Sequence, residues 1–172
     1  MKKAQVSIVM GSDSDLPIVQ ETTKILERFA IPFEITIISA HRTPDRAVKH
    51  SNSLIERGIK VVIAAAGGAA HLAGVIAAST TLPVIGLPIM SKTLSGVDSL
   101  YSIVQMPPGV PVATVAINGG TNAGLLAIQI LALSDNNLQT KFSDFKLEMA
   151  SEVTKKSEKL QNFGIEEYLK RK

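Results

Sequence analysis

Residues 33–44, FEITIISAHRTP, join the end of an apolar run to the beginning of a helix-forming pattern. The run from Phe33 to Ile38 predicts a strand, whereas Thr43 and Pro44 suit the N-cap and the first position of a helix. The turn between them carries His41, which can exchange a proton near neutral pH, and Arg42, a permanent cation. Because a helix N-terminus also attracts anions, the stretch predicts a strand–turn–helix unit with an anion site at its turn.

The same alternation repeats along the chain. Further strands are predicted at residues 6–10, 59–66, 84–87 and 112–117, and helices at about 16–30, 44–57, 70–79, 97–105 and 123–133. Parallel neighbouring strands require crossovers, and each strand reads as a continuous apolar run, as in a sheet covered on both faces. We therefore expect a three-layer α/β/α fold with a five-stranded parallel sheet in the flavodoxin-like order 2-1-3-4-5.

Two local expectations follow from the same patterns. Pro88 should end the fourth strand. The helix over residues 44–57 should stop at Gly58, and its inner face should consist of Ala47, Val48, Leu54 and Ile55.

In a sheet of this order, ligands bind at the carboxyl ends of the central strands. Those ends carry three distinctive loops: residues 11–15 (GSDSD), residues 39–44 and residues 67–71 (GGAAH). Their convergence on one place predicts a ligand site there.

The C-terminal part of the chain differs from the rest. Residues 1–134 form the expected α/β domain, and residues 135–172 read as a helical extension with a break at Asn162-Phe163-Gly164. The preceding helix, residues 123–133, is apolar almost all round, whereas a surface helix should show a polar face. The helix over residues 70–79 is similarly weak in charge, so we expect both helices to be buried against their own sheet and against another subunit, in a homo-oligomer. The extension should pack on the domain, as part of a single domain overall, or on neighbouring subunits.

Composition excludes several classes of protein. The chain has no Cys, which excludes disulfides and thiolate chemistry, and its three His residues form no metal-binding motif, so no metal is expected. Aromatic residues make up 4% and the net charge is +3. The basic residues at the two ends read as solvated tails, so no nucleic-acid partner is expected. These residues are Lys2, Lys3, Lys170, Arg171 and Lys172. No apolar run is long enough for a signal peptide or a membrane span, so we expect a cytoplasmic protein with no membrane contact.

Each candidate residue has a structural alternative. His41 is interpreted as a general acid/base, although a surface histidine at a helix start is possible, and His71, after two glycines, is equally compatible with either role. His50 is interpreted as solvated surface. Ser12 and Asp15 could bind sugar hydroxyls or simply cap a helix, and Arg42 could anchor an anion or form an ordinary salt bridge.

Four motifs resemble the PurE family, the N5-carboxyaminoimidazole ribonucleotide mutases of purine biosynthesis. They are residues 11–15 (GSDSD), 39–44 (SAHRTP), 66–72 (AGGAAHL) and 96–107 (GVDSLYSIVQMP), and the resemblance covers roughly residues 6–134. It implies an octamer whose C-terminal helical part reaches neighbouring subunits, with neither cofactor nor metal. It also implies a small-molecule ribonucleotide substrate, whose carboxylate moves from an exocyclic nitrogen to the adjacent ring carbon through trapped CO2.

The resemblance also implies roles for individual residues. Ser12, Ser39 and Arg42 would hold the phosphate, and Asp15 would bind the ribose hydroxyls. His41 would be the catalytic acid/base with His71 beside it, and the base and carboxylate would lie against Ala40, Ala66, Gly67 and Gly68. Arg42-Thr43 after the histidine is similar to the mutase class, because the class that carboxylates aminoimidazole ribonucleotide (AIR) directly with CO2 tends to carry Lys there. Direct carboxylation and a non-catalytic, flavodoxin-like nucleotide-binding module remain the alternatives.

Overall fold

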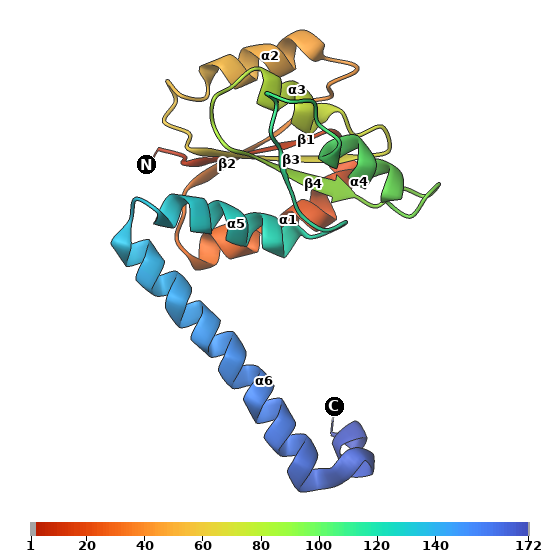
Figure 1. Cartoon of the computed structure of the whole chain (residues 1–172), viewed down its shortest axis with the longest axis vertical. Coiled ribbons are helices and arrows are strands. Elements are labelled where there is room, and N and C mark those ends of the chain that lie inside the picture. Colours follow the sequence, from red (N-terminus) through yellow and green to blue (C-terminus); the bar gives the residue numbers. More distant parts are fainter. Residues whose placement is uncertain (1–2, 172) are drawn as a thin grey trace. The chain divides into compact units, whose positions relative to one another are not determined.

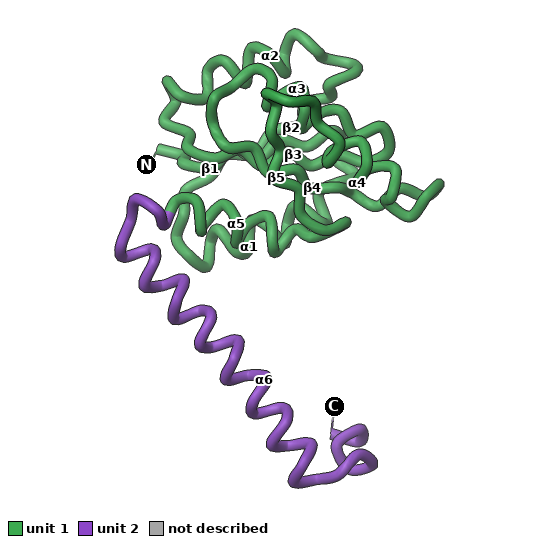
Figure 2. The backbone as a smooth tube through the Cα atoms, in the orientation of Figure 1, with its two compact units in different colours: residues 1–131 green, residues 132–172 purple. Residues whose placement is uncertain are grey.

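The computed structural model describes residues 3–171 and divides into two compact units, Met1–Leu131 and Ala132–Lys172 (Figure 2). The division lies close to the boundary at residue 134 that the sequence suggests. The terminal lysines Lys2 and Lys172 lie outside the described residues, and the side chains of Lys3, Lys170 and Arg171 are exposed.

The first unit is built on a parallel sheet of five strands in the order β2-β1-β3-β4-β5 (Figure 1), which confirms the predicted topology. The strands are β1 (Val6–Met10), β2 (Phe33–Ile37), β3 (Val61–Gly67), β4 (Val84–Ile89) and β5 (Ala113–Thr114). The three central strands are buried along almost their whole length, as their continuous apolar runs predict.

Helices cover both faces of this sheet and produce the expected three layers. They are α1 (Leu16–Arg28), α2 (Pro44–Ser53), α3 (Leu72–Ala78), α4 (Val97–Val104) and α5 (Gly120–Ala132). In Figure 1, α2 and α3 lie on one face and α1 and α5 on the other. Side chains of α2, α3 and α4, including Ala47, Ile76 and Ile103, join one buried cluster with β1 and β3. On the opposite face, the Thr22 hydroxyl of α1 donates a buried hydrogen bond to the Gly120 carbonyl at 2.8 Å.

The structure corrects the expectation that every strand is a continuous apolar run. Strand β2 lies at the edge of the sheet and alternates in burial, with Ile35 and Ile37 each 43% exposed. An edge strand has only one neighbouring strand, so its side chains need not be covered on both faces.

Strand β4 corrects the prediction at Pro88, since it continues through that proline to Ile89. The Pro88 carbonyl accepts the Asn118 N–H at 2.8 Å, on the side of the sheet away from β3. The backbone nitrogen and carbonyl of one strand residue point to the same side, so the missing N–H leaves the ladder with β3 intact. Strand β5 is shorter than predicted, because it pairs only with Ile85 and Gly86.

Helix α2 is also shorter than predicted. It ends at Ser53, and a turn carries the chain to Gly58, whose φ of +89° lies in the left-handed region. Ala47 and Leu54 are fully buried as expected, but Val48 and Ile55 are 42% and 58% exposed.

The second unit consists of α6, Asn136–Lys170. The Asp135 side chain caps its start by accepting the Leu138 N–H at 3.0 Å. Gly164 interrupts the helix with φ 69° and ψ 171°, which confirms the break expected at Asn162-Phe163-Gly164. Between residues 3 and 171, no helix is both long enough and apolar enough to cross a membrane.

Candidate active site

The three loops that were expected to converge do so, in a pocket of about 670 Å³ at the carboxyl ends of the central strands. All of the predicted site residues line it: Ser12, Asp15, Ser39, Ala40, His41, Arg42, Ala66, Gly67, Gly68 and His71. A parallel sheet brings these loops together because every strand ends at the same edge.

One corner of the pocket combines a cation with hydroxyl groups. The Arg42 backbone N–H and Nε both donate to Ser39 Oγ, at 3.2 and 3.3 Å, and Nη2 donates to the Gly11 carbonyl at 3.4 Å. The Thr43 hydroxyl does not cap α2 as predicted, because it donates instead to the Ser39 carbonyl at 2.9 Å. These contacts hold the turn and place the guanidinium beside the first loop. An anion bound there could accept hydrogen bonds from the guanidinium and from that loop.

A histidine pair forms the chemical centre of the pocket. His41 Nε2 lies 2.7 Å from His71 Nδ1, with the rings 4.9 Å apart and 70° from parallel. A contact this short between two ring nitrogens requires a proton between them, donated by one ring and accepted by the other. The pair can therefore hold and move one proton, which favours a functional role for both residues.

The first loop holds a buried carboxylate. Asp15 is 5% exposed; its side chain accepts the Ser12 N–H at 3.2 Å and the Ser14 hydroxyl at 3.3 Å. Ser12 and Asp15 form a capping box over the short helical turn Asp13–Asp15, so the capping interpretation is confirmed for both. Burial raises the pKa of Asp15, and these hydrogen bonds oppose the rise only in part. A ligand that donates hydroxyl groups would compensate the remaining loss of hydration.

Small residues form the opposite wall. Gly68 adopts φ +64°, a left-handed conformation that side-chain-bearing residues rarely take, and its N–H donates to Ser99 Oγ at 2.9 Å. A Cβ on Gly67 would lie 3.4 Å from the Ile89 carbonyl oxygen, so the turn packs closely on the end of β4.

One side of the pocket consists of residues that were not among the predicted site residues. Met90, Ser91 and Lys92, in the loop after β4, also line it. This loop has no periodic pattern, but it follows a central strand at the same edge of the sheet, and that position is the signal that could have identified it. No group of three or more His, Asp or Glu side chains within residues 3–171 is placed to hold a metal ion.

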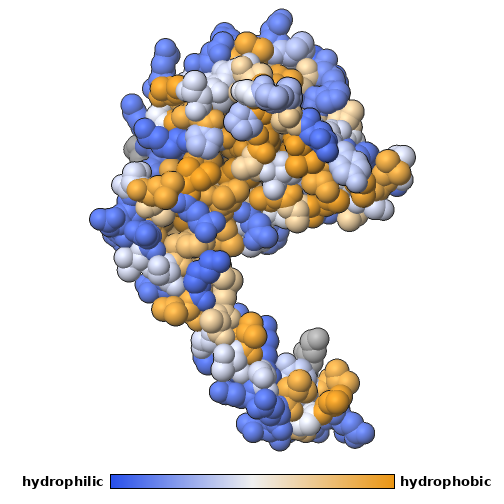
Figure 3. All heavy atoms as spheres, viewed as in Figure 1, coloured by the Kyte–Doolittle hydropathy of each residue, from blue (hydrophilic) through white to orange (hydrophobic). Residues whose placement is uncertain are grey.

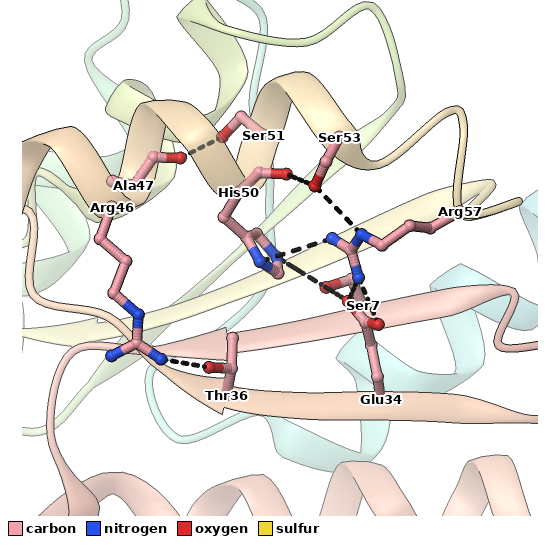
Figure 4. Close-up of polar contacts among 9 residues, drawn as sticks. All are labelled: Ser7, Glu34, Thr36, Arg46, Ala47, His50, Ser51, Ser53 and Arg57. Carbon is pink, nitrogen blue, oxygen red and sulfur yellow. Dashed lines mark hydrogen bonds and ion pairs between the residues drawn. The ribbon is translucent and has the colours of Figure 1, made fainter.

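The interpretation of His50 as a solvated surface residue is wrong (Figure 4). Its side chain is only 14% exposed, and Nε2 lies 3.0 Å from the fully buried Ser7 hydroxyl, which donates to Glu34 Oε1 at 2.8 Å. His50 Nδ1 faces Arg57 Nη2 at 3.4 Å, and Arg57 Nη1 is paired with the Glu34 carboxylate. Nδ1 therefore accepts and Nε2 donates, which makes His50 a neutral link in a structural network.

The pKa of His50 is lowered in the folded protein. Burial contributes most, the Arg57 charge adds to it, and the Glu34 carboxylate opposes both. Ser7 gives its proton to Glu34 and is inaccessible, so the arrangement is no nucleophilic site.

The fold and the pocket together define a doubly wound α/β protein with a small-molecule site at the switch point of its sheet. A profile of the AIR carboxylase family matches residues 5–152. The chain therefore belongs to the AIR carboxylase (PurE) family.

Individual relatives agree with this assignment. The N5-carboxyaminoimidazole ribonucleotide mutase of Thermotoga maritima is 54% identical over 98% of both chains, and that of Pyrococcus horikoshii is 55% identical over 98% of this chain and 95% of its own. The phosphoribosylaminoimidazole carboxylase of Saccharomyces cerevisiae is 55% identical over the whole of this chain, but this chain spans only 30% of it. The crystal structure of Treponema denticola PurE superposes with a TM-score of 0.81 at 29% identity, over 90% of this chain and 97% of its own.

Proposed function

We propose that the protein is an N5-carboxyaminoimidazole ribonucleotide mutase of de novo purine biosynthesis, an isomerase that moves a carboxylate within its substrate. The observation that carries the proposal is the placement of a proton-sharing histidine pair and a guanidinium–hydroxyl corner in one pocket. Relatives that bear the mutase name match from end to end, which supports the same reaction here.

The pocket suggests how the substrate lies. The phosphate accepts from Arg42, Ser39 and Ser12, and the ribose hydroxyls donate to the Asp15 carboxylate, whose burial favours such donors. The base then lies toward the wall of small residues, Ala40, Ala66, Gly67 and Gly68. That orientation places the migrating carboxylate near the two imidazoles.

His41 carries the chemistry as a general acid and then a general base. It protonates the carbamate nitrogen while the bond from that nitrogen to the carboxyl carbon breaks, which releases CO2 and an electron-rich enamine. The adjacent ring carbon attacks CO2, and His41, now neutral, removes the proton from that carbon and restores the aromatic ring. His71 supports His41 by sharing the proton across the 2.7 Å contact. No electron passes to an outside acceptor, and the mechanism requires CO2 to stay beside the ring until the ring carbon attacks it.

The yeast relative motivates direct carboxylation of AIR as the second candidate. This chain covers only 30% of that relative, whereas it covers nearly all of two mutases, so the mutase is favoured. The deciding experiment supplies the purified protein with the carbamate substrate at low bicarbonate and follows the carboxylated product. Turnover only from the free amine plus CO2 would overturn the mutase assignment.

A His41→Asn variant separates catalysis from simple nucleotide binding. Asparagine can keep a hydrogen bond to His71 but cannot titrate near neutral pH, so binding and fold should persist while turnover falls by at least ~10²-fold. Circular dichroism and substrate binding serve as controls. Full turnover by the variant would support a module whose histidine takes no part in chemistry.

Assembly into a homo-oligomer, an octamer as the family resemblance implies, is part of the same proposal. Apolar surface spreads over the face of the first unit seen in Figure 3, and large apolar side chains are exposed, among them Ile55, Leu94 and Tyr101. A biosynthetic enzyme of this kind would act in the cytoplasm. Light scattering at micromolar concentration tests the assembly, and a monomeric mass would contradict it.

A further inference from the structure

Helix α4 belongs to the most extended of the family-like motifs, residues 96–107, yet none of the residues assigned to the site lies in it. Ser99, in its first turn, is fully buried. A buried hydroxyl loses its hydration, so it needs hydrogen-bond partners among the protein's own groups.

Ser99 finds two such partners, both of them backbone groups that belong to the pocket wall. Its Oγ donates to the Ile89 carbonyl at 2.6 Å and accepts the Gly68 N–H at 2.9 Å. Gly68 follows β3 and Ile89 ends β4, and both residues line the pocket. One side chain therefore ties together the ends of two neighbouring strands.

The shape of the pocket wall depends on the position of the turn that Ser99 holds. Gly68 adopts φ +64°, and Gly67 packs closely on Ile89, so a small movement of the turn changes the shape of the wall. The preceding residue acts similarly: the Asp98 carboxylate accepts the hydroxyl of Ser91, another pocket residue, at 2.6 Å. Adjacent residues of one helical turn thus hold adjacent parts of the wall.

We propose that Ser99 is a positioning residue for the carboxylate transfer, which keeps the Gly67–Gly68 turn against the end of β4 and so keeps the shape of the wall beside which CO2 is held. The proposal rests on the proposed mutase function. Ser99 touches no reacting atom, and it acts through the backbone that it holds. Its loss should let CO2 escape before the ring carbon captures it.

The test follows the fate of the carboxylate in a Ser99→Ala variant of the full chain. The carbamate substrate carries ¹³C in its carboxyl group, the buffer contains unlabelled bicarbonate, and the spontaneous reaction is subtracted. The wild-type protein should retain the label in the product. The variant should release free amine and incorporate unlabelled CO2, and its turnover should fall by about 10-fold or more with KM changed by less than about 3-fold.

Ser51→Ala is the matched control. Ser51 is also buried, but its hydroxyl donates to the Ala47 carbonyl within α2 at 2.9 Å and does not line the pocket. This variant should lose one buried hydrogen bond of the hydroxyl and still retain the label. If Ser51→Ala loses as much ¹³C label as Ser99→Ala, the loss reflects a general destabilisation of the fold and the proposal is wrong.

A second variant, Ser99→Cys, keeps nearly the same volume with a weaker donor and should give intermediate label retention. Full retention by a folded Ser99→Ala protein would overturn the proposal. Failure of both Ser99 variants to fold would also overturn it, because Ser99 would then serve the folding core. A wild-type protein that makes no product would instead refute the mutase function, and one that itself loses the label would refute the retention of CO2 in the pocket.

Discussion

Replacing Arg42 with alanine tests the assignment of the anion corner. The guanidinium is exposed and makes only long contacts to Ser39 Oγ, at 3.3 Å, and to the Gly11 carbonyl, at 3.4 Å. The contribution of such contacts to the free energy of unfolding is within about 0.5 kcal/mol. The variant should therefore remain folded, and the effect should fall on ligand binding.

The magnitude follows from the interaction that the substrate phosphate would lose. A hydrogen bond to a charged group contributes about 1.5–3 kcal/mol, which corresponds to roughly 10-fold to 150-fold in affinity. The phosphate lies away from the reacting nitrogen and carbon, so Arg42 stabilises the bound substrate and the transition state equally. KM should rise by that factor, and kcat should change by less than about 3-fold.

Steady-state measurement of product formation checks this prediction, with a nucleoside analogue that lacks the phosphate as the control substrate. Wild type and Arg42→Ala should handle the analogue alike. Arg42→Lys, which keeps the charge but loses the planar fork, should give an intermediate KM. The reasoning would be refuted by a fall in kcat at unchanged KM, or by an equal penalty with the analogue.

Two further predictions concern stability. The pKa of His50 is lowered in the folded protein, so unfolding takes up a proton as the pH falls below the unfolded value near 6.5; the free energy of unfolding should drop there by up to about 1.4 kcal/mol per pH unit. Thermal unfolding between pH 7.5 and 5.5 should show a steeper loss for wild type than for His50→Gln, and equal slopes would contradict the network. A Cβ on Gly86 would lie 2.2 Å from Ile103 Cγ2 and 2.9 Å from Val112 Cγ1. Gly86→Ala should therefore lower the free energy of unfolding, measured by urea denaturation, by about 1–3 kcal/mol or more. A variant as stable as wild type would show that the neighbouring side chains can move to accommodate the methyl group.

Much of the fold was predictable because it rests on local patterns. The alternation of apolar runs with helical segments requires parallel strands, and parallel strands place the loops that contain Ser12, His41 and His71 at one edge. The ends of elements were less predictable. Whether β4 continues through Pro88 depends on which side of the strand its neighbours occupy, and Val48 and Ile55 are exposed because packing, not composition, decides which face of α2 is covered.

The amino-acid pattern is enough to establish the class of fold, the edge of the sheet that holds the pocket, and the residue types available there. Which groups become partners depends on how the chain folds in three dimensions. His50 pairs with Ser7 and Arg57, His41 with His71, and Ser99 with Gly68 and Ile89. The physical reason is that a hydrogen bond forms or fails on a difference of a few tenths of an ångström in the distance between segments far apart in the chain. Periodicity and composition describe only the neighbours along it.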